Sequence, residues 1–234
     1  MNNINLLLDD YIETEEFGVI YFPKVSFLKQ FGEKGYNKLI FPFAITVDIL
    51  DIPDEYKKEV KVFDLFFQNL KYDEKETYCD VLKESLISFF NIVPQFDIHN
   101  YCIIIDKKII TRDNFDNLAD IILQISKAHR VNIEKPPKFE NETQKDIYYK
   151  IQEGRSRKNK ENAISFATMI NVAMNCGNSY VSPKEINVMT IFQLMSRYEA
   201  IMGADSWHIN FDKYLVGCDP KDLDLTYWVY KIKI

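Results

Sequence analysis

The side chains that commonly bind metals or act in catalysis are scattered along this chain of 234 residues. Its three histidines are His99, His129 and His208. None belongs to a His-x-x-x-His pair or stands beside cysteine and acidic residues at metal-ligand spacing. We therefore predict no metal site and expect each histidine to be a surface or partly packed side chain.

The sequence also lacks the short motifs of nucleophilic catalysis and phosphate binding, namely Gly-x-Ser-x-Gly, Gly-x-x-x-x-Gly-Lys and Gly-x-Gly-x-x-Gly. Carboxylates gather in DEKE at residues 73–76 and in DPKDLD at residues 219–224. A catalytic pair needs one carboxyl with a raised pKa in an apolar pocket, whereas these runs contain lysines and have a solvated character. We predict a protein that is not an enzyme, with no catalytic residue and no cofactor.

Composition and cysteine spacing indicate a globular protein that stays in the cytosol. Hydrophobic residues make up 47% of the chain, yet no apolar run approaches the roughly 18 residues of a membrane span. The start, MNNINLLLDDYIE, has no basic segment before its apolar run, so we predict no secretory signal. No Cys-x-x-Cys pair occurs, which argues against a disulfide framework and against a zinc site.

The segment 150–162 is a candidate for nucleic-acid binding. It carries five basic and two acidic residues, a net charge of +3, in a chain whose total is −6. Its basic patch would consist of Arg155, Arg157, Lys158 and Lys160. Nucleic-acid sites usually add aromatic side chains that stack on bases, and here the nearest aromatics only flank the charges. We therefore favour a solvated entry to a helix whose apolar stripe starts at Ile164.

Large aromatic and methionine side chains in the C-terminal part are candidates for binding a protein partner. The segment VMTIFQLMSRYEAIM, residues 188–202, has the clearest amphipathic pattern in the chain. Such side chains dominate the energetics of interfaces, although a place in the core is the favoured alternative for each of them. The candidates are Phe192, Met195, Tyr198, Trp207 and Trp228.

The elements of the N-terminal part combine strands with helices. FGVIYF at residues 17–22 predicts a strand, and the apolar spacing after Pro23 predicts a short helix that ends near Gly32. Two further helices are predicted, over residues 62–70 and over ETYCDVLKESLISFFNIV at residues 76–93.

A change of period follows in YCIIIDKKIITRDNFDNLADIILQ. Its β-branched runs at 103–105 and 109–111 predict a hairpin. From Phe115 the apolar residues take helical spacing, with Asp113 or Asn114 as the candidate N-cap.

After His129 the sequence predicts a boundary and then helices only. The polar stretch around Pro136 and Pro137 is the boundary. Helices are expected over 161–174, over 188–202, and from about Asp205 to Gly217, with Pro220 in a further helical turn. The expected fold class is α+β and mainly helical. We predict an N-terminal α+β domain with a small hairpin sheet (1–130), a polar and basic linker with a helix start (131–160), and an all-helical C-terminal domain (161–234).

The order of these pieces resembles tail-morphogenesis proteins of phages and prophages of low-GC Gram-positive bacteria, which are tail-assembly-chaperone-like or structural. The resemblance lies in FPKVSFLKQFGEKGY (22–36), in CIIIDKKIITRDNFDNLADII (102–122) and in EGRSRKNKEN (153–162). It is most specific at the end, in INVMTIFQLMSRYEAI followed by INFDKYLVGCDPKDLDLTYWVYKI. The chain departs from that pattern at Val216, where a small residue is usual, and in the tail VYKIKI after Trp228.

This resemblance implies a non-enzymatic protein that acts in tail assembly through contacts with other tail proteins, such as the tail tube, the tape measure or the baseplate. It implies that the protein acts in the cytoplasm of the infected bacterium, either only there or also as a part of the virion, and that it does not contact a membrane. The resemblance does not indicate an oligomeric state. Two alternatives stay open: a nucleic-acid-associated protein that uses residues 155–160, and a phage protein that inhibits a host defence factor.

Overall fold

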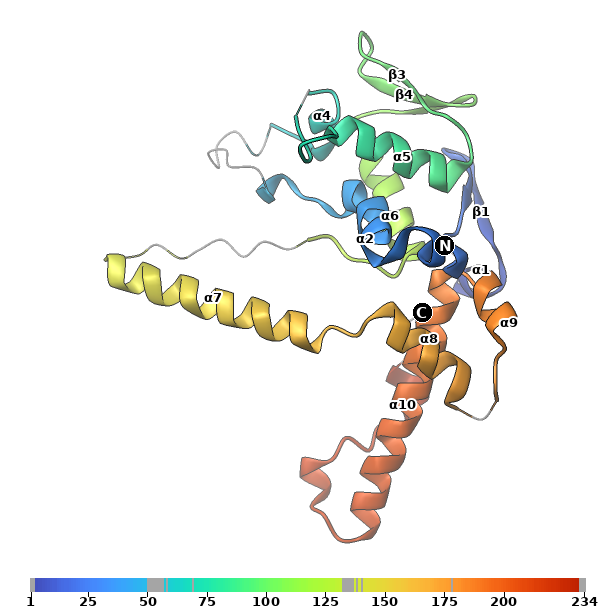
Figure 1. The fold of residues 1–234 in the computed structure, drawn as a ribbon, viewed down its shortest axis with the longest axis vertical. Helices are drawn as coiled ribbons and strands as arrows, with labels where there is room; N and C mark the ends of the chain where they lie inside the picture. Colours follow the sequence, from blue (N-terminus) through green and yellow to red (C-terminus); the bar gives the residue numbers. More distant parts are fainter. Residues whose placement is uncertain are drawn as a thin grey trace.

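The computed structural model describes residues 3–49, 57, 59–68, 70–131, 137, 139, 141–177 and 179–231. The molecule is 58% helical, with a two-stranded and a three-stranded sheet (Figure 1). The predicted class, α+β and mainly helical, is therefore confirmed. Figure 1 shows a body made of the N-terminal elements, from which two helical limbs extend in different directions.

The chain begins with helix α1 (Asn3–Leu8) and a hairpin of strands β1 (Tyr11–Thr14) and β2 (Gly18–Tyr21). The strands are antiparallel, with Tyr11 opposite Tyr21. The strand predicted at 17–22 is thus confirmed as β2. Strand β1, which alternates exposed and half-buried residues over four positions, was not predicted because its YIET sequence has no apolar run.

Helix α2 (Val25–Ala44) is interrupted at Gly32, whose backbone has φ 68° and ψ −176°. The prediction that the first helix ends near Gly32 is confirmed, but the chain resumes helical geometry at once and continues past Pro42. Proline is disfavoured inside a helix because it removes an N–H donor. Here Pro42 lies in the last turn and is buried, so packing offsets that cost.

The rest of the body consists of η1 (Val47–Ile49), α4 (Val62–Leu65), α5 (Tyr78–Phe90), a three-stranded sheet and α6 (Phe115–Ile125). The predicted helices at 76–93 and from Phe115 are confirmed as α5 and α6, with Asn114 at the N-cap position. The prediction for 62–70 is wrong in extent. Helix α4 has four residues, turns follow it, and Leu70 is exposed.

The three-stranded sheet has the order β3-β4-β5 and is antiparallel throughout. Its strands are β3 (Gln95–Asp97), β4 (Cys102–Ile105) and β5 (Lys108–Ile110). The predicted hairpin is confirmed as β4 and β5, with Ile103 opposite Ile110. Strand β3 was missed because its three residues follow Pro94 and carry too little periodic signal.

Aromatic rings fill the centre of the body. The Phe115 ring lies 6.0 Å from that of Phe43, 5.4 Å from Phe63 and 5.5 Å from Phe66, and Phe43 meets Phe89 edge-on. All five side chains are almost fully buried. Helices α2, α4, α5 and α6 therefore share one core.

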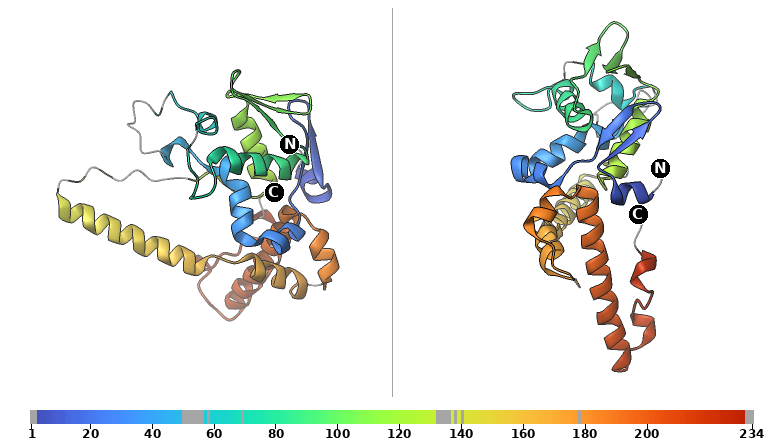
Figure 2. Two further views of the ribbon diagram at one scale, coloured as in Figure 1. Left: turned by 45° about the horizontal axis from the view of Figure 1, so that its top comes forward. Right: turned by 90° about the vertical axis from the view of Figure 1, so that its right-hand side faces the viewer.

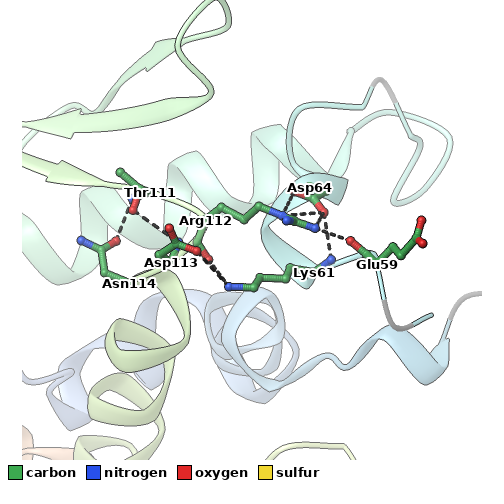
Figure 3. Close-up of polar contacts among 7 residues, drawn as sticks. All are labelled: Glu59, Lys61, Asp64, Thr111, Arg112, Asp113 and Asn114. Carbon is green, nitrogen blue, oxygen red and sulfur yellow. Dashed lines mark hydrogen bonds and ion pairs between the residues drawn. The ribbon is translucent and has the colours of Figure 1, made fainter. Parts of the chain in front are cut away.

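An ion-pair network holds α4 against the loop that leads from β5 to α6 (Figure 3). The Arg112 guanidinium donates to both carboxylate oxygens of Asp64, at 2.9 to 3.1 Å. The Lys61 ammonium donates to the Asp113 carboxylate at 3.1 Å and to the Arg112 carbonyl at 3.2 Å. These contacts give the four-residue α4 a fixed position that its length alone would not provide.

The C-terminal part contains α7 (Glu142–Asn162), α8 (Phe166–Asn175), α9 (Pro183–Val188), α10 (Ile191–Leu215), η2 (Pro220–Asp222) and η3 (Trp228–Lys231). The segment 131–160, predicted as a linker with a helix start, is helical from Glu142 onward, where α7 begins. Pro136, part of the predicted boundary, lies outside the described residues. The helix predicted over 161–174 corresponds to α8, but Ile164 is exposed and Ser165 is the N-cap, so the stripe begins at Phe166.

The two helices predicted at 188–202 and from Asp205 form one helix, α10. Gly203 lies between them, and a helix tolerates a glycine at a cost of about 1 kcal/mol. The predicted stop near Gly217 and the helical turn at Pro220 are confirmed.

The C-terminal helices join the body through main-chain hydrogen bonds and a shared core. The Val25 N–H donates to the Met189 carbonyl at 2.9 Å, and the Ile191 N–H donates to the Pro23 carbonyl at 2.8 Å. Val25 also packs in a small apolar cluster with C-terminal side chains, which are Ala173, Val181, Ile186 and Leu194. The first half of α10 is thereby fixed to the body.

Candidate protein-contact surface

Residues 203–230, here called the distal arm, project away from the body (Figure 2). The arm consists of the second half of α10 and the segment that returns beside it through η2 and η3. Among the described side chains of α10, none beyond Ile201 is buried. The sequence of the arm nevertheless remains rich in aromatic and aliphatic residues.

An aromatic cluster joins the two sides of the arm. The Trp207 ring stacks on Phe211, with ring centroids 5.1 Å apart, and meets Tyr227 edge-on at 5.3 Å. Tyr227 in turn contacts Trp228 and Tyr230. The Trp207 indole N–H also points to the Leu225 carbonyl at 3.4 Å. The Trp207–Tyr227 ring contact and this hydrogen bond therefore join α10 to the returning segment.

Local sequence signals explain why the chain reverses here. Gly217 has φ 96°, a conformation that favours glycine, and its N–H donates to the Tyr214 carbonyl at 3.0 Å. The Asp219 carboxylate then accepts from the Lys221 N–H at 2.9 Å and caps η2, with Pro220 in its first turn. Near the base of the arm, Gly203 faces the Trp228 side chain, where an added Cβ would lie 3.6 Å from the Trp228 Cβ.

Large apolar side chains around this cluster face solvent. Leu215 is 65% exposed, and Val216 and Tyr230 are each 81% exposed. Further apolar residues of the arm are also exposed, namely Ile209, Phe211, Tyr214, Tyr227 and Val229. Exposed apolar side chains gathered on one projecting arm indicate a site of protein contact or a liability to aggregate.

A cavity of about 410 Å³ opens where the arm leaves the body. Its lining includes Arg197, Ile201, His208 and Trp228. The Arg197 guanidinium donates to the Ala173 and Ser179 carbonyls, at 2.9 and 2.8 Å, and so ties α10 to the end of α8. The base of the arm is thus held in place, whereas its tip is exposed.

The structure separates the five aromatic and methionine candidates into two groups. Phe192 is 2% exposed and lies in the main core, and Met195 packs against that core. Tyr198 is half-buried on α10 ahead of the arm. Trp207 and Trp228 lie in the arm. Sequence patterns alone did not single out Phe211, Tyr214 and Tyr227. For Phe211 and Tyr214 a signal was present, because the apolar residues of α10 after residue 201 fall on two opposite sides of the helix.

The basic candidates lie on α7, the other limb. Arg155, Arg157 and Lys158 are exposed there, and the side chain of Lys160 lies outside the described part. Arg157 pairs with Glu153 one turn earlier, at 3.5 Å. Because residues two positions apart point in nearly opposite directions on a helix, Arg155 and Arg157 do not form one patch.

The parts of the chain that the structure describes bear on metal binding and on one of the two acidic runs. Within those parts, no three His, Cys, Asp or Glu side chains come close enough to hold a metal. In the run at 73–76, the N–H groups of Lys75 and Glu76 donate to the Asp73 carboxylate at 2.7 and 2.9 Å and lower its pKa. That direction is opposite to the raised pKa that a general acid needs. Over the same described residues, no helix has the length and apolarity to cross a bilayer.

Comparison with known proteins gives one similarity. Residues 157–233 match a family model described as YomV second domain, and YomV is a Bacillus phage or prophage protein. The match covers less than half of the chain and extends from the end of α7 through the whole distal arm. It associates this part of the chain with a phage protein domain. Neither the curated proteins nor the solved structures contain a match to the chain.

Proposed function

We propose that the chain is a phage- or prophage-encoded protein that acts in tail assembly through protein contacts, without catalysis. It works in the cytoplasm of the infected bacterium, either as a chaperone-like factor or as a component retained in the tail. The similarity to a phage protein domain and the resemblance of the sequence to tail-morphogenesis proteins support this proposal.

The exposed apolar surface of the distal arm is the single observation that carries the proposal. A side chain such as Val216, 81% exposed, gains nothing from the fold itself, but a partner that covers it would remove it from water. Aromatic residues that are anchored at one edge and exposed at the other are typical of protein interfaces. The proposed contact site consists of Leu215 and Val216 at the arm's tip and Tyr230 nearer its base.

Mass spectrometry of purified phage particles, together with affinity capture of this protein from infected cells, tests the proposal. A fixed copy number in the particle supports a structural tail component. Absence from the particle, with a tail tube or tape measure protein in the capture, supports a transient chaperone. Absence from the particle and from every complex with a tail protein overturns the proposal.

A further inference from the structure

Helix α7 is a long helix whose described side chains are mostly exposed, with Phe139 in ring contact with Tyr148 and Tyr149. It has 21 residues, and its described side chains are exposed apart from Tyr148 and Gln152, which are half-buried. Both figures of the whole molecule show it extending from the body (Figures 1 and 2). A helix that is almost wholly polar and isolated is only marginally stable in water. Contact with another molecule would stabilise it.

One face of α7 combines apolar and basic side chains. Ile147 and Ile151, 53% and 49% exposed, lie one turn apart. Lys150 lies three residues after Ile147. Gly154 and Lys158 lie three and seven residues after Ile151, so all three residues share this face. This surface, here called the α7 face, would fit an acidic and apolar partner surface.

The distal arm has that chemistry. From Asp205 to Tyr230 it carries five aspartates and two lysines, a net charge of −3, among its exposed apolar residues. The α7 face carries two basic residues, Lys150 and Lys158, and no acidic residue, a charge of +2. The two surfaces are therefore complementary both in charge and in apolar content.

Helix α7 is longer than the part of α10 that lies in the distal arm. At 1.5 Å per residue, α7 spans about 31 Å and the arm's part of α10 about 20 Å. The two limbs diverge from the body, so α7 does not lie along the arm of its own chain (Figure 2). A second molecule brings the same two limbs and can meet both.

We propose that two copies of this chain form a twofold-symmetric dimer in which the α7 face of each copy docks on the distal arm of the other. A twofold axis makes this contact twice, which doubles the buried surface and covers both limbs. The inference rests on the proposed role of the arm as a protein-contact surface and names a second copy as its first partner.

Charge reversal on each limb, measured by size-exclusion chromatography with light scattering, tests the dimer. The arm variant carries Asp205→Lys and Asp212→Lys, and the α7 variant carries Lys150→Glu and Lys158→Glu. Wild type is expected at twice the chain mass of 27.7 kDa. Each variant alone should dimerise about 100-fold more weakly, because like charges then face one another in both contacts.

Mixing the two variants gives the decisive result. In a mixed dimer, the reversed arm meets the reversed α7 face, and the unchanged arm meets the unchanged α7 face, so dimerisation should return. A control with Lys145→Glu and Lys184→Glu makes the same change in net charge away from the α7 face and should remain a dimer. Circular dichroism checks that every variant is folded.

The inference is overturned if the wild-type protein is monomeric at its highest soluble concentration. It is also overturned if both charge-reversal variants still dimerise as wild type does, or if mixing the two variants does not restore dimerisation. These outcomes are separable from the proposed function, since the measurement uses purified protein alone. A monomer that still captures tail proteins refutes the dimer only, and a dimer that is found with no phage component refutes the tail role only.

Discussion

Thr190 is the residue at which the body, α1 and α10 meet. It is fully buried, its hydroxyl accepts from the Gln193 N–H at 3.1 Å, and its own N–H donates to the Gln193 side chain at 2.9 Å. The Gln193 amide then donates to the Leu7 carbonyl at 2.8 Å. One capping box thus starts α10 and links it to the N-terminus.

Replacing Thr190 with alanine should lower the free energy of unfolding by about 1–2 kcal/mol, because the partly buried Gln193 N–H loses its acceptor. Thr190→Ser keeps the hydroxyl and should retain most of that stability. Urea unfolding followed by circular dichroism measures both variants. Equal losses in the two variants would show that the lost methyl group, rather than the cap, determines the effect.

Asp80 predicts a pH dependence of stability at the start of α5. The Thr77 hydroxyl and the Thr77 N–H donate to its carboxylate at 2.7 and 2.9 Å and lower its pKa. A carboxyl whose pKa is lower in the folded state stabilises the fold above its unfolded pKa of about 3.9, and that stabilisation is lost as pH falls through the folded pKa. The gap in urea midpoint between wild type and Asp80→Ala should therefore be largest at neutral pH and shrink below about pH 4. A gap that is unchanged in acid would refute the assignment.

At the scale of elements, the break in α2 depends on a conformation that only glycine adopts readily. Gly32 has φ 68° and ψ −176°, so Gly32→Ala should lower the free energy of unfolding by about 1–3 kcal/mol, even though nothing lies within 4 Å of the added Cβ. Gly154→Ala in α7 is the matched control. It also adds its Cβ to open space, but within a regular helix, and should raise helix content and stabilise α7 by about 0.5–1 kcal/mol. Thermal unfolding and circular dichroism test the opposite signs.

The two halves of α10 should respond differently to truncation of a large aromatic side chain. Phe192 is buried in the main core, so Phe192→Ala should cost about 3–5 kcal/mol of unfolding free energy. Trp207 packs within the arm, so Trp207→Ala should leave the urea midpoint of the body nearly unchanged while it loosens the returning segment. Comparable losses of midpoint in the two variants would mean that the arm and the body unfold as one unit.

Sequence patterns predicted the elements that bury a regular stripe and missed those that do not. The stripe from Phe115 predicts α6, and the β-branched runs predict the hairpin of β4 and β5. Helix α7 has no stripe, so its polar residues were interpreted as a linker. Of the arm, sequence patterns named only Trp207 and Trp228 as partner-contact candidates, because periodicity shows which residues share a face, whereas the fold shows which of the described side chains are exposed.

At the scale of the whole molecule, the structure has a fixed body and two exposed limbs. The main-chain hydrogen bonds at Val25 and Ile191 join the C-terminal helices to the body, so the arm projects from a rigid base. That arrangement presents an apolar tip at a distance from the core, which suits contact with another protein more than chemistry in a closed pocket.

Affinity capture from phage-infected cells with a variant of the arm's tip tests the central claim most directly. Leu215→Asp with Val216→Asp places two charges on the exposed tip, and Ile98→Asp with Ile109→Asp places two charges on exposed positions of the body as a control. Quantitative mass spectrometry should find tail proteins with wild type and with the control, and at least about tenfold less with the tip variant. Equal recovery of tail proteins with the folded tip variant would contradict the account.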